Sequence, residues 1–535
     1  MASRVRPINM MSFTGGLNMR ADAFELGDGE SPDMLNVDVD PRGGFVVRRG
    51  WTAWNPTAVT GTWNPRSLFV HELTSGTDRL WMANNNLLYH GTANSFTKLQ
   101  IAAVDVVADA SPHGADFAPW GDELFVACGR NRQAVYMNSS NVGTLLTAGA
   151  AATWTAYATP SSTVMPKADL AASHAGYVFV ASTNEDSVAY PNRIRWSHPN
   201  NPKAWMVDDY LDILEGGGKI TGLVPMRDHI LVFKQSAVWA IYGYDSATWQ
   251  LVNVSRERGA VSRQAIARSE NAVYFYSHLS GIYAIADGNA PQEVSLSLRP
   301  MFTDGNFSAT YGNSVWLGWL GDRLYFSAPY STTSTANEAT TIFVFDPAIG
   351  NGAWMIYRGS DGLGLGPYAQ GGFAGGAGLR LGCARSAARV MIIDNSDTPV
   401  DEITGVAVGF ASHYVTPWVD GGFPTLKKSW RRPDFVMKER DQQYNVTVAA
   451  YRDYDEANAV RSKIVSVDAG GTGSLYGTFL YGSGVLYAAS AKGSRIERGG
   501  NLGSARSIQL RISGDATKPW GVDAIVFKMI PRRLR

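Results

Sequence analysis

Six short runs of alternating aromatic and aliphatic residues recur along the chain, each directly after an acidic or polar turn. Each run is followed by a second run of the same kind, so the pattern predicts pairs of strands in contact through a turn. A looser seventh copy lies at residues 378–383. The six clear copies are residues 78–83, 122–127, 176–181, 228–233, 271–276 and 322–327.

The spacing of these copies decides the architecture that they predict. Counted from positions 78, 122, 175, 228, 271 and 322, successive copies lie 43 to 53 residues apart. Blades of β-propellers repeat at about 40–50 residues and contain four strands, whereas leucine-rich repeats are shorter. No Trp-Asp or kelch motif recurs. The sequence therefore predicts an all-β protein with a degenerate β-propeller of six to seven blades over residues 61–400.

The two ends of the chain follow other patterns. Residues 1–60 are interrupted by glycine and proline, and only residues 45–49 resemble a strand. We expect an extended N-terminal arm that cannot bury a core of its own and lies along the propeller or a neighbouring subunit. Residues 401–535 contain more strictly alternating strands, as at 444–451 and 522–527. They predict a separate C-terminal domain that resembles a β-sandwich or barrel.

Composition supports a packed core and excludes a dominant charge. Among 535 residues, 45% are hydrophobic, and 47 Lys and Arg balance 47 Asp and Glu. A neutral chain has no overall field that would attract nucleic acid or an anionic membrane. No run of about 18 apolar residues is present, so no membrane span is expected. No apolar segment follows the N-terminal charges, so no signal peptide is expected.

The chain has two cysteines, Cys128 and Cys383. Two cysteines cannot form a disulfide framework, and their spacing does not decide whether they meet. Cysteine is one of the residues most often found inside proteins. We therefore expect both to be small, buried core residues.

The search for catalytic or metal-binding motifs favours a protein that is not an enzyme and has no cofactor. The eight histidines form no HExxH motif or close pair, and no P-loop or nucleophile elbow is present. Asn36, Asp38 and Asp40 are spaced like calcium ligands, but Pro41 replaces the glycine and no glutamate stands at the twelfth position. A turn between two strands is the favoured interpretation of residues 36–44.

Three pairs of arginines could contact phosphates, but they occur beside acidic residues. Ion pairs or solvated loop ends are the favoured interpretation. The pairs are Arg48 with Arg49, Arg431 with Arg432, and Arg532 with Arg533.

Both ends of the chain carry sequence motifs of one known family. The opening contains FTGGLNMR at 13–20, an acidic stretch that ends in DPRGG at 44, and RRG at 48–50. The ending contains WRRP at 430–433 and WGVDAI at 520–525. These motifs, which span about 150 residues together, resemble those of tail proteins of tailed bacteriophages. With a propeller between them, the chain is most similar to the tail nozzle, or tail tube, proteins of short-tailed phages.

This resemblance implies a structural virion protein that is assembled in the host cytoplasm. It implies a homo-oligomeric ring of six copies at the distal end of the tail, below the portal and adaptor proteins of the head-to-tail connector. Double-stranded DNA would pass through the ring without sequence recognition, and tail fibres or spikes would attach outside. The alternatives are a baseplate, minor tail or decoration protein of a long-tailed phage, or an intracellular propeller scaffold.

The residues assigned to assembly lie in the N-terminal motifs. We expect Phe13, Leu17 and Asn18 to anchor the arm between subunits, and Arg48 and Arg49 to hold its docking strand. A chain without residues 1–44 is then expected to stay soluble as a monomer and to lose ring assembly. The sequence assigns no residue to the lumen of the ring or to phosphate contact.

Overall fold

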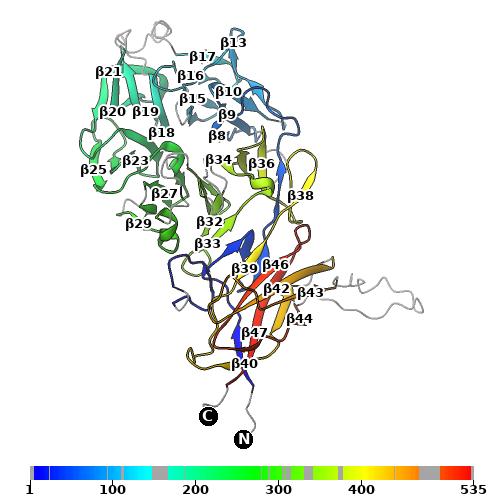
Figure 1. Cartoon of the computed structure of the whole chain (residues 1–535). Helices are drawn as coiled ribbons and strands as arrows, with labels where there is room; N and C mark the ends of the chain where they lie inside the picture. The colour runs from blue at the N-terminus through cyan, green and yellow to red at the C-terminus, as the bar shows by residue number, and fades with distance from the viewer. Residues whose placement is uncertain are drawn as a thin grey trace, which may run out of the picture.

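The computed structural model has two parts, a ring of seven small sheets and a pair of larger sheets against the rim of that ring (Figure 1). Nearly all regular structure is β, with a few short 3₁₀ helices such as η2 (Arg263–Ala265) and η3 (Leu296–Phe302). The structure describes residues 5–531, apart from 23–24, 77, 93, 110–113, 147–166, 186, 279, 287–289, 304–306, 308–314, 331–340, 372–377, 439, 441 and 469–493.

The first six blades of the ring each contain four antiparallel strands in chain order, with the first strand innermost. Blades one to three contain β8 (Pro65–His71), β9 (Arg79–Asn84), β10 (Leu87–Gly91), β11 (Thr97–Lys98); β14 (Asp116–Trp120), β15 (Glu123–Ala127), β16 (Val135–Met137), β17 (Gly143–Leu145); β18 (Lys167–His174), β19 (Tyr177–Glu185), β20 (Val188–His198) and β21 (Asn201–Asp212). Blades four to six contain β22 (Ile220–Pro225), β23 (His229–Lys234), β24 (Val238–Tyr242), β25 (Gln250–Ser255); β26 (Ile266–Arg268), β27 (Ala272–Ser277), β28 (Gly281–Ala286), β29 (Gln292–Glu293); β30 (Trp316–Leu320), β31 (Arg323–Ala328), β32 (Thr341–Asp346) and β33 (Ala353–Tyr357). A hairpin of β12 (Gln100–Ile101) and β13 (Val104–Asp105) follows blade one.

The seventh blade joins the two ends of the propeller. Its first three strands are β34 (Leu365–Gly371), β35 (Leu379–Ala384) and β36 (Val390–Ser396). Its fourth strand, β7 (Gly50–Ala53), comes from before blade one and pairs antiparallel with β36. Because β34 contacts both β30 and β8, the ring is closed. The predicted propeller is thus confirmed, with seven blades. Two further strands, β37 (Val400–Glu402) and β38 (Ala407–Gly409), extend this sheet.

Each repeated phrase of the sequence corresponds to the turn into the second strand of a blade and to that strand itself. In blade six, Gly321 and Asp322 both have positive φ angles and connect the paired residues Leu320 and Arg323. Two such residues form the type I′ turn that suits the twist of a hairpin. The turn residues and the apolar runs after them therefore predicted the second and third strands of each blade. The innermost strand, which precedes the turn, has no comparable sequence pattern.

Blade strands are apolar on both faces because neighbouring blades cover both. All six residues of β23 and of β32 are buried. Cys128 and Cys383 are free and buried in two different apolar clusters, so the expected core role of both cysteines is confirmed.

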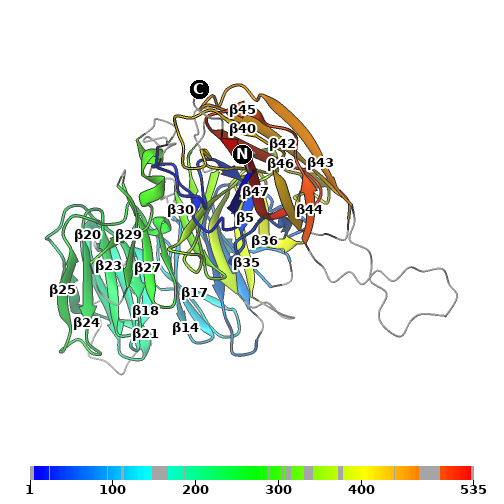
Figure 2. The same ribbon diagram turned by 90° about the horizontal axis from the view of Figure 1, so that it is seen from below.

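The second part is a sandwich of two sheets that share one core with blade six. Figure 2 shows it beside β30, β35 and β36 and away from β20 to β25. One sheet contains β1 (Arg6–Met10), β5 (Val37–Val39), β6 (Phe45–Val47), β40 (Lys428–Trp430), β41 (Asp434–Lys438), β44 (Ser494–Arg498), β45 (Gly503–Ala505) and β47 (Gly521–Pro531). The other contains β4 (Met34–Leu35), β39 (His413–Val415), β42 (Tyr444–Arg452), β43 (Arg461–Val467) and β46 (Ile508–Gly514).

Aromatic rings from both ends of the chain fill the sandwich. Phe45 stacks on Tyr414 with ring centroids 4.3 Å apart, and Phe13 meets both rings edge-on. Trp520 contacts Phe45 edge-on, with ring centroids 5.9 Å apart. Aromatic pairs of this geometry add about 0.5–1.5 kcal/mol each to the burial of their surface.

The N-terminal residues are built into both parts of the molecule. β1 and β6 pair with β47, β4 pairs with β39, and β7 closes the propeller. The short strands β2 (Gly16–Leu17) and β3 (Glu30–Ser31) pair with each other, and β2 lies against β33. The segment that the sequence predicted to be an arm therefore packs on its own chain in this structure.

Candidate functional site at the junction of propeller and sandwich

A groove of about 950 Å³ lies where the sandwich meets blades six and seven. Strands β5 and β6 form one wall, and the turns and strand ends of the two blades form another. Both parts of the molecule supply charged side chains to it. The charged residues that line the groove are Asp38, Asp40, Arg49, Arg323, Arg380, Asp394, Asp397, Lys438 and Arg440.

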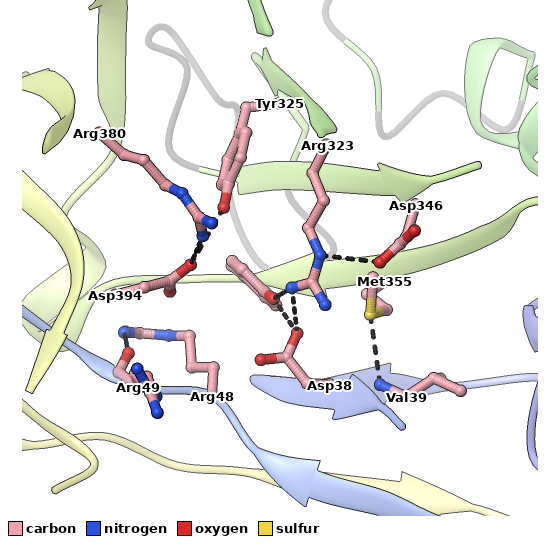
Figure 3. A network of polar contacts seen from close by, with 11 residues as sticks. Asp38, Val39, Arg48, Arg49, Arg323, Tyr325, Asp346, Met355, Arg380 and Asp394 are labelled. Carbon is pink, nitrogen blue, oxygen red and sulfur yellow. Dashed lines mark hydrogen bonds and ion pairs between the residues drawn. The ribbon is translucent and has the colours of Figure 1, made fainter. Parts of the chain in front are cut away.

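Arg323 is the central cation of the groove and connects the propeller to the N-terminal strands. It follows the type I′ turn of blade six, and its guanidinium lies 2.9 Å from Asp346 and 3.1 Å from Asp38 (Figure 3). The Tyr357 hydroxyl also donates a hydrogen bond to Asp38. Burial and the charge of Asp38 raise the pKa of Tyr357 well above its ordinary value, so this hydroxyl keeps its proton.

Asp394 faces the groove from an irregular part of β36. The strand pairs with β7 at Ile392 and again at Ser396, so extra residues bulge out between these positions. Asp394 has a φ of 58°, an uncommon conformation for a residue with a side chain. Bulges re-aim side chains and occur near functional sites. The bulge therefore explains how a sheet residue comes to line the groove.

The two carboxylate oxygens of Asp394 have different surroundings. Oδ2 accepts hydrogen bonds from Arg380 at 2.9 Å and from the Tyr325 hydroxyl at 3.3 Å (Figure 3). Oδ1 is buried and has no hydrogen-bond partner among the described residues. Burial raises the pKa of Asp394, the negative charge of Asp38 adds to this effect, and Arg380 opposes it. Asp394 at the groove wall thus combines an uncommon backbone conformation with a carboxylate oxygen that has no hydrogen-bond partner among the described residues.

The raised pKa of Asp394 predicts a pH dependence of stability. An acid that holds its proton more tightly when folded contributes stability at low pH, and this contribution is lost as the pH rises from its unfolded pKa through its folded pKa. Asp394→Asn removes this titration. The stability of the native chain relative to this variant should therefore fall as the pH rises above about 4, the ordinary pKa of an aspartate, measured by urea unfolding. A difference that stays constant or grows with pH would contradict the assignment.

The predicted turn at residues 36–44 is confirmed and borders the groove. The backbone N–H of Gly43 donates to the carbonyl of Asp40, and the N–H of Asp40 donates to the carbonyl of Gly44. Asp40 also pairs with Lys438 of β41. Burial would raise the pKa of Asp40, but the bonds from Lys438 and from the N–H of Arg42 hold it below its ordinary value. These carboxylates are thus occupied by protein groups, and no cluster of three metal-ligating side chains occurs in the described part of the chain.

Beside the groove, Arg48 and Asp401 form a fully buried ion pair. Two nitrogens of Arg48 lie 3.0 and 2.8 Å from the two carboxylate oxygens, and both side chains are 0% exposed. The guanidinium is held between the rings of Trp51 and Phe410, at 4.0 and 3.6 Å from their centroids. Its Nε donates to Asn36 at 2.9 Å.

Asp401 also accepts hydrogen bonds from the backbone N–H groups of Trp51 and Ser360. A buried ion pair with complete hydrogen bonding fixes geometry more than it adds net stability. This pair fastens the end of the N-terminal segment to the last strands of the propeller.

The five residues assigned to assembly lie in different environments. Phe13 and Leu17 are buried in the shared core, and Arg48 is buried in its ion pair. Asn18 caps a local turn by accepting bonds from the N–H groups of residues 20 and 21. Arg49 is 61% exposed and pairs with the exposed Asp397. Their role between subunits stays a prediction, and all five make contacts within the chain, three of them as buried residues.

Other sequence-based assignments can also be located. Arg48 and Arg49 both form ion pairs, as favoured for the arginine pairs, and residues 431 and 432 are exposed. Arg532 and Arg533 lie outside the described residues. Sequence analysis missed Arg323, Arg380 and Asp394. The first follows a recognised repeat turn, which could have marked it, whereas Asp394 lies on a bulge that no local pattern predicts.

The groove offers charged atoms of both signs, most of them paired across the junction. The interactions found among its described residues are ion pairs and hydrogen bonds, without a nucleophile held by a general base.

Comparisons with known proteins give likenesses of fold only. No protein-family model and no curated protein matches the chain. Two solved structures of BBS1N in complex with ARL6DN, soaked with lead or mercury, are 11% identical, cover 65% of this chain and 98% or 97% of theirs, and have TM-scores of 0.38 and 0.40. A catalytically inactive virginiamycin B lyase from Staphylococcus aureus with quinupristin is 10% identical, covers 63% and 96%, and has a TM-score of 0.39.

The described ranges contain no helix that is long and apolar enough to cross a membrane.

Proposed function

We propose that this chain is a structural subunit of a bacteriophage tail, and that copies of it form a ring at the distal end of a short tail. The ring would retain the packaged genome and let double-stranded DNA pass at ejection. It would bind the portal and adaptor proteins on one side and fibres or spikes outside, in a virion assembled in the host cytoplasm.

The observation that carries this proposal is the joint folding of the two segments that resemble phage tail proteins. These segments come from opposite ends of the chain, yet they build one sandwich. Phe13 packs on Tyr414, Phe45 packs on Tyr414 and Trp520, and β1 pairs with β47. The motifs at both ends of the chain that carry the resemblance therefore lie in or beside one structural module.

A ring needs a surface on which neighbouring copies meet head to tail. Two of the strands at the sheet ends of the sandwich, β43 and β44, each pair on only one side in the described part of the chain. Ile464 of β43 and Ile496 of β44 are 62% and 68% exposed. Free strand edges with exposed apolar side chains favour pairing with another chain. These strands are the surface through which we expect the next copy to bind.

We expect purified protein to give the mass of six copies by light scattering, alone or mixed with the portal–adaptor complex. Replacing Ile464 and Ile496 together by aspartate should reduce ring formation at least about tenfold, since two charges would have to be buried at the contact. Val104→Asp is the matched control, because Val104 is 68% exposed but lies on the β13 hairpin of blade one.

A monomer that ignores the portal–adaptor complex would contradict the ring proposal. That result would favour the baseplate, minor tail or decoration protein of a long-tailed phage, or the propeller scaffold. A ring that forms equally well with both aspartates would keep the function and reject β43 and β44 as the contact.

A further inference from the structure

A ring closed by head-to-tail contacts needs two different surfaces on each copy, because each copy binds one neighbour on either side. The proposed function, on which this inference rests, assigns β43 and β44 to one of these surfaces. The second surface should lie on the far side of the molecule. Figure 1 and Figure 2 both show two strands of blade three, β20 and β21, at the end of the molecule opposite β43 and β44.

The surface formed by β43 and β44 is basic. These strands end the two sheets of the sandwich and contact each other. Their described exposed charges are all cations, on Arg461, Lys463 and Arg498. Arg461 and Lys463 donate hydrogen bonds to the backbone carbonyls of Asn501 and Arg498, which leaves their charges without a carboxylate partner among the described residues. The three cations and the two exposed isoleucines of these strands are together called the basic edge: Arg461, Lys463, Ile464, Ile496 and Arg498.

The outermost strand of blade three carries the opposite charge. In the described part of the chain, β21 pairs with β20 alone. Its exposed charged residues, Asp208 and Asp212, are both acids, and the exposed Glu215 follows shortly after the strand. Of these three acids, only Asp212 has an ion-pair partner among the described residues. Tyr210 is 41% exposed and Leu214 is 77% exposed between the acids. These five residues are together called the acidic edge.

Tyr210 is held in place by its neighbours on blade three. The guanidinium of Arg193 lies over the rings of Tyr190 and Tyr210, 3.8 and 4.0 Å from their centroids. Two of its nitrogens donate to the carboxylate of Asp212 at 2.8 Å each, and the third donates to Glu185 at 3.1 Å. An aromatic side chain that is fixed before binding loses little conformational freedom on binding. Tyr210 therefore has the properties of an interface anchor.

The charges of the two edges select contact between different surfaces. A basic edge against an acidic edge places opposite charges together, whereas either edge against its own counterpart would place like charges together. The acids of β21 also discourage pairing of its open edge with a second β21. We propose that the acidic edge of one copy binds the basic edge of the next copy of this chain, with Tyr210 and Leu214 packed against Ile464 and Ile496.

Charge reversal of each edge in the full-length protein tests this proposal. Asp208→Lys with Glu215→Lys reverses the acidic edge, and Arg461→Glu with Lys463→Glu reverses the basic edge. All four side chains are exposed, so the changes leave the core intact. Each double variant should raise the protein concentration needed for half of the chains to assemble by at least about tenfold, measured by light scattering, because like charges would then meet at the contact.

A chain with all four changes again has opposite charges on its two edges. It should regain most of the assembly that each double variant loses, a result that misfolding of the double variants would not give. The matched control reverses two exposed acids elsewhere on the propeller, Glu257→Lys with Glu270→Lys, and should assemble like the native chain.

Three results would overturn the proposal while the tail function stands: native assembly in the variant with a reversed acidic edge, no recovery in the chain with four changes, or equal losses in the control. Loss of assembly on reversal of the basic edge alone would show that β43 and β44 bind a surface other than β21. A native chain that stays monomeric with and without the portal–adaptor complex would contradict the tail function and this contact together, so the two failures are distinguishable.

Discussion

Replacing Arg48 by alanine is expected to lower the free energy of unfolding by about 3–5 kcal/mol. The variant would leave Asp401 buried without its cation, at a site where both partners are 0% exposed. It would also leave a space between the rings of Trp51 and Phe410, which now enclose the guanidinium. Urea unfolding followed by tryptophan fluorescence would measure the loss.

The neighbouring arginine provides a matched control within the same motif. Arg49 is 61% exposed, and its partner Asp397 is 88% exposed. Exposed ion pairs contribute between about 0 and 1 kcal/mol, so Arg49→Ala should change stability little. Arg48→Lys should cause an intermediate loss in the free energy of unfolding. Lysine keeps the charge, but it cannot form the bidentate ion pair or lie flat between the two rings. Equal effects of Arg48→Ala and Arg49→Ala would contradict the described burial of the Arg48 ion pair.

Deleting residues 1–44 is expected to prevent the sandwich from folding. The deletion removes β1, β4 and β5 from the two sheets, and it removes the buried side chains of Phe13 and Leu17. Each large buried side chain contributes several kcal/mol, and whole domains are stable by only about 5–15 kcal/mol. We therefore expect most of the truncated protein to be insoluble or rapidly digested by protease, measured as soluble yield and by limited proteolysis.

This expectation replaces the one from sequence, in which the N-terminal arm could be removed without loss of solubility. Removal of residues 1–5 is the control, because β1 begins at Arg6 and Val5 is exposed. Phe13→Ala is a milder test that should cost about 3–5 kcal/mol. A truncated chain that purifies as a soluble monomer with native circular dichroism would instead support the expectation from sequence, that residues 1–44 are an arm needed only for assembly.

Much of the propeller could be predicted because its signals are local. A polar turn followed by a buried run identifies the second strand of a blade, as at Asp322 and the residues of β31. Both the type I′ turn and the apolar run depend on residues next to each other in sequence. The innermost strands were missed because nothing adjacent marks them. Strand β22, for example, is a short apolar segment without a preceding turn of this type.

The junction could not be predicted in the same way. The sequence indicated that residues 36–44 form a turn and that Arg48 belongs to a motif, and the turn is confirmed. It could not indicate that Arg48 meets Asp401, because 353 positions separate them and neither has a periodic signal. The charge environment of Asp394 likewise depends on Asp38 and Arg380, which come from different parts of the chain.

The sequence by itself thus determined the all-β class, the repeated blades and the polar turns that recur in them. Only the tertiary structure decided that β7 completes the seventh blade, that the N-terminal strands enter the sandwich, and where the groove at the junction lies. The reason is that hydrophobic periodicity specifies which residues are buried, but not which distant strand buries them. Pairing between the two ends of the chain is set by the shape and charge of surfaces that exist only after both ends have folded together.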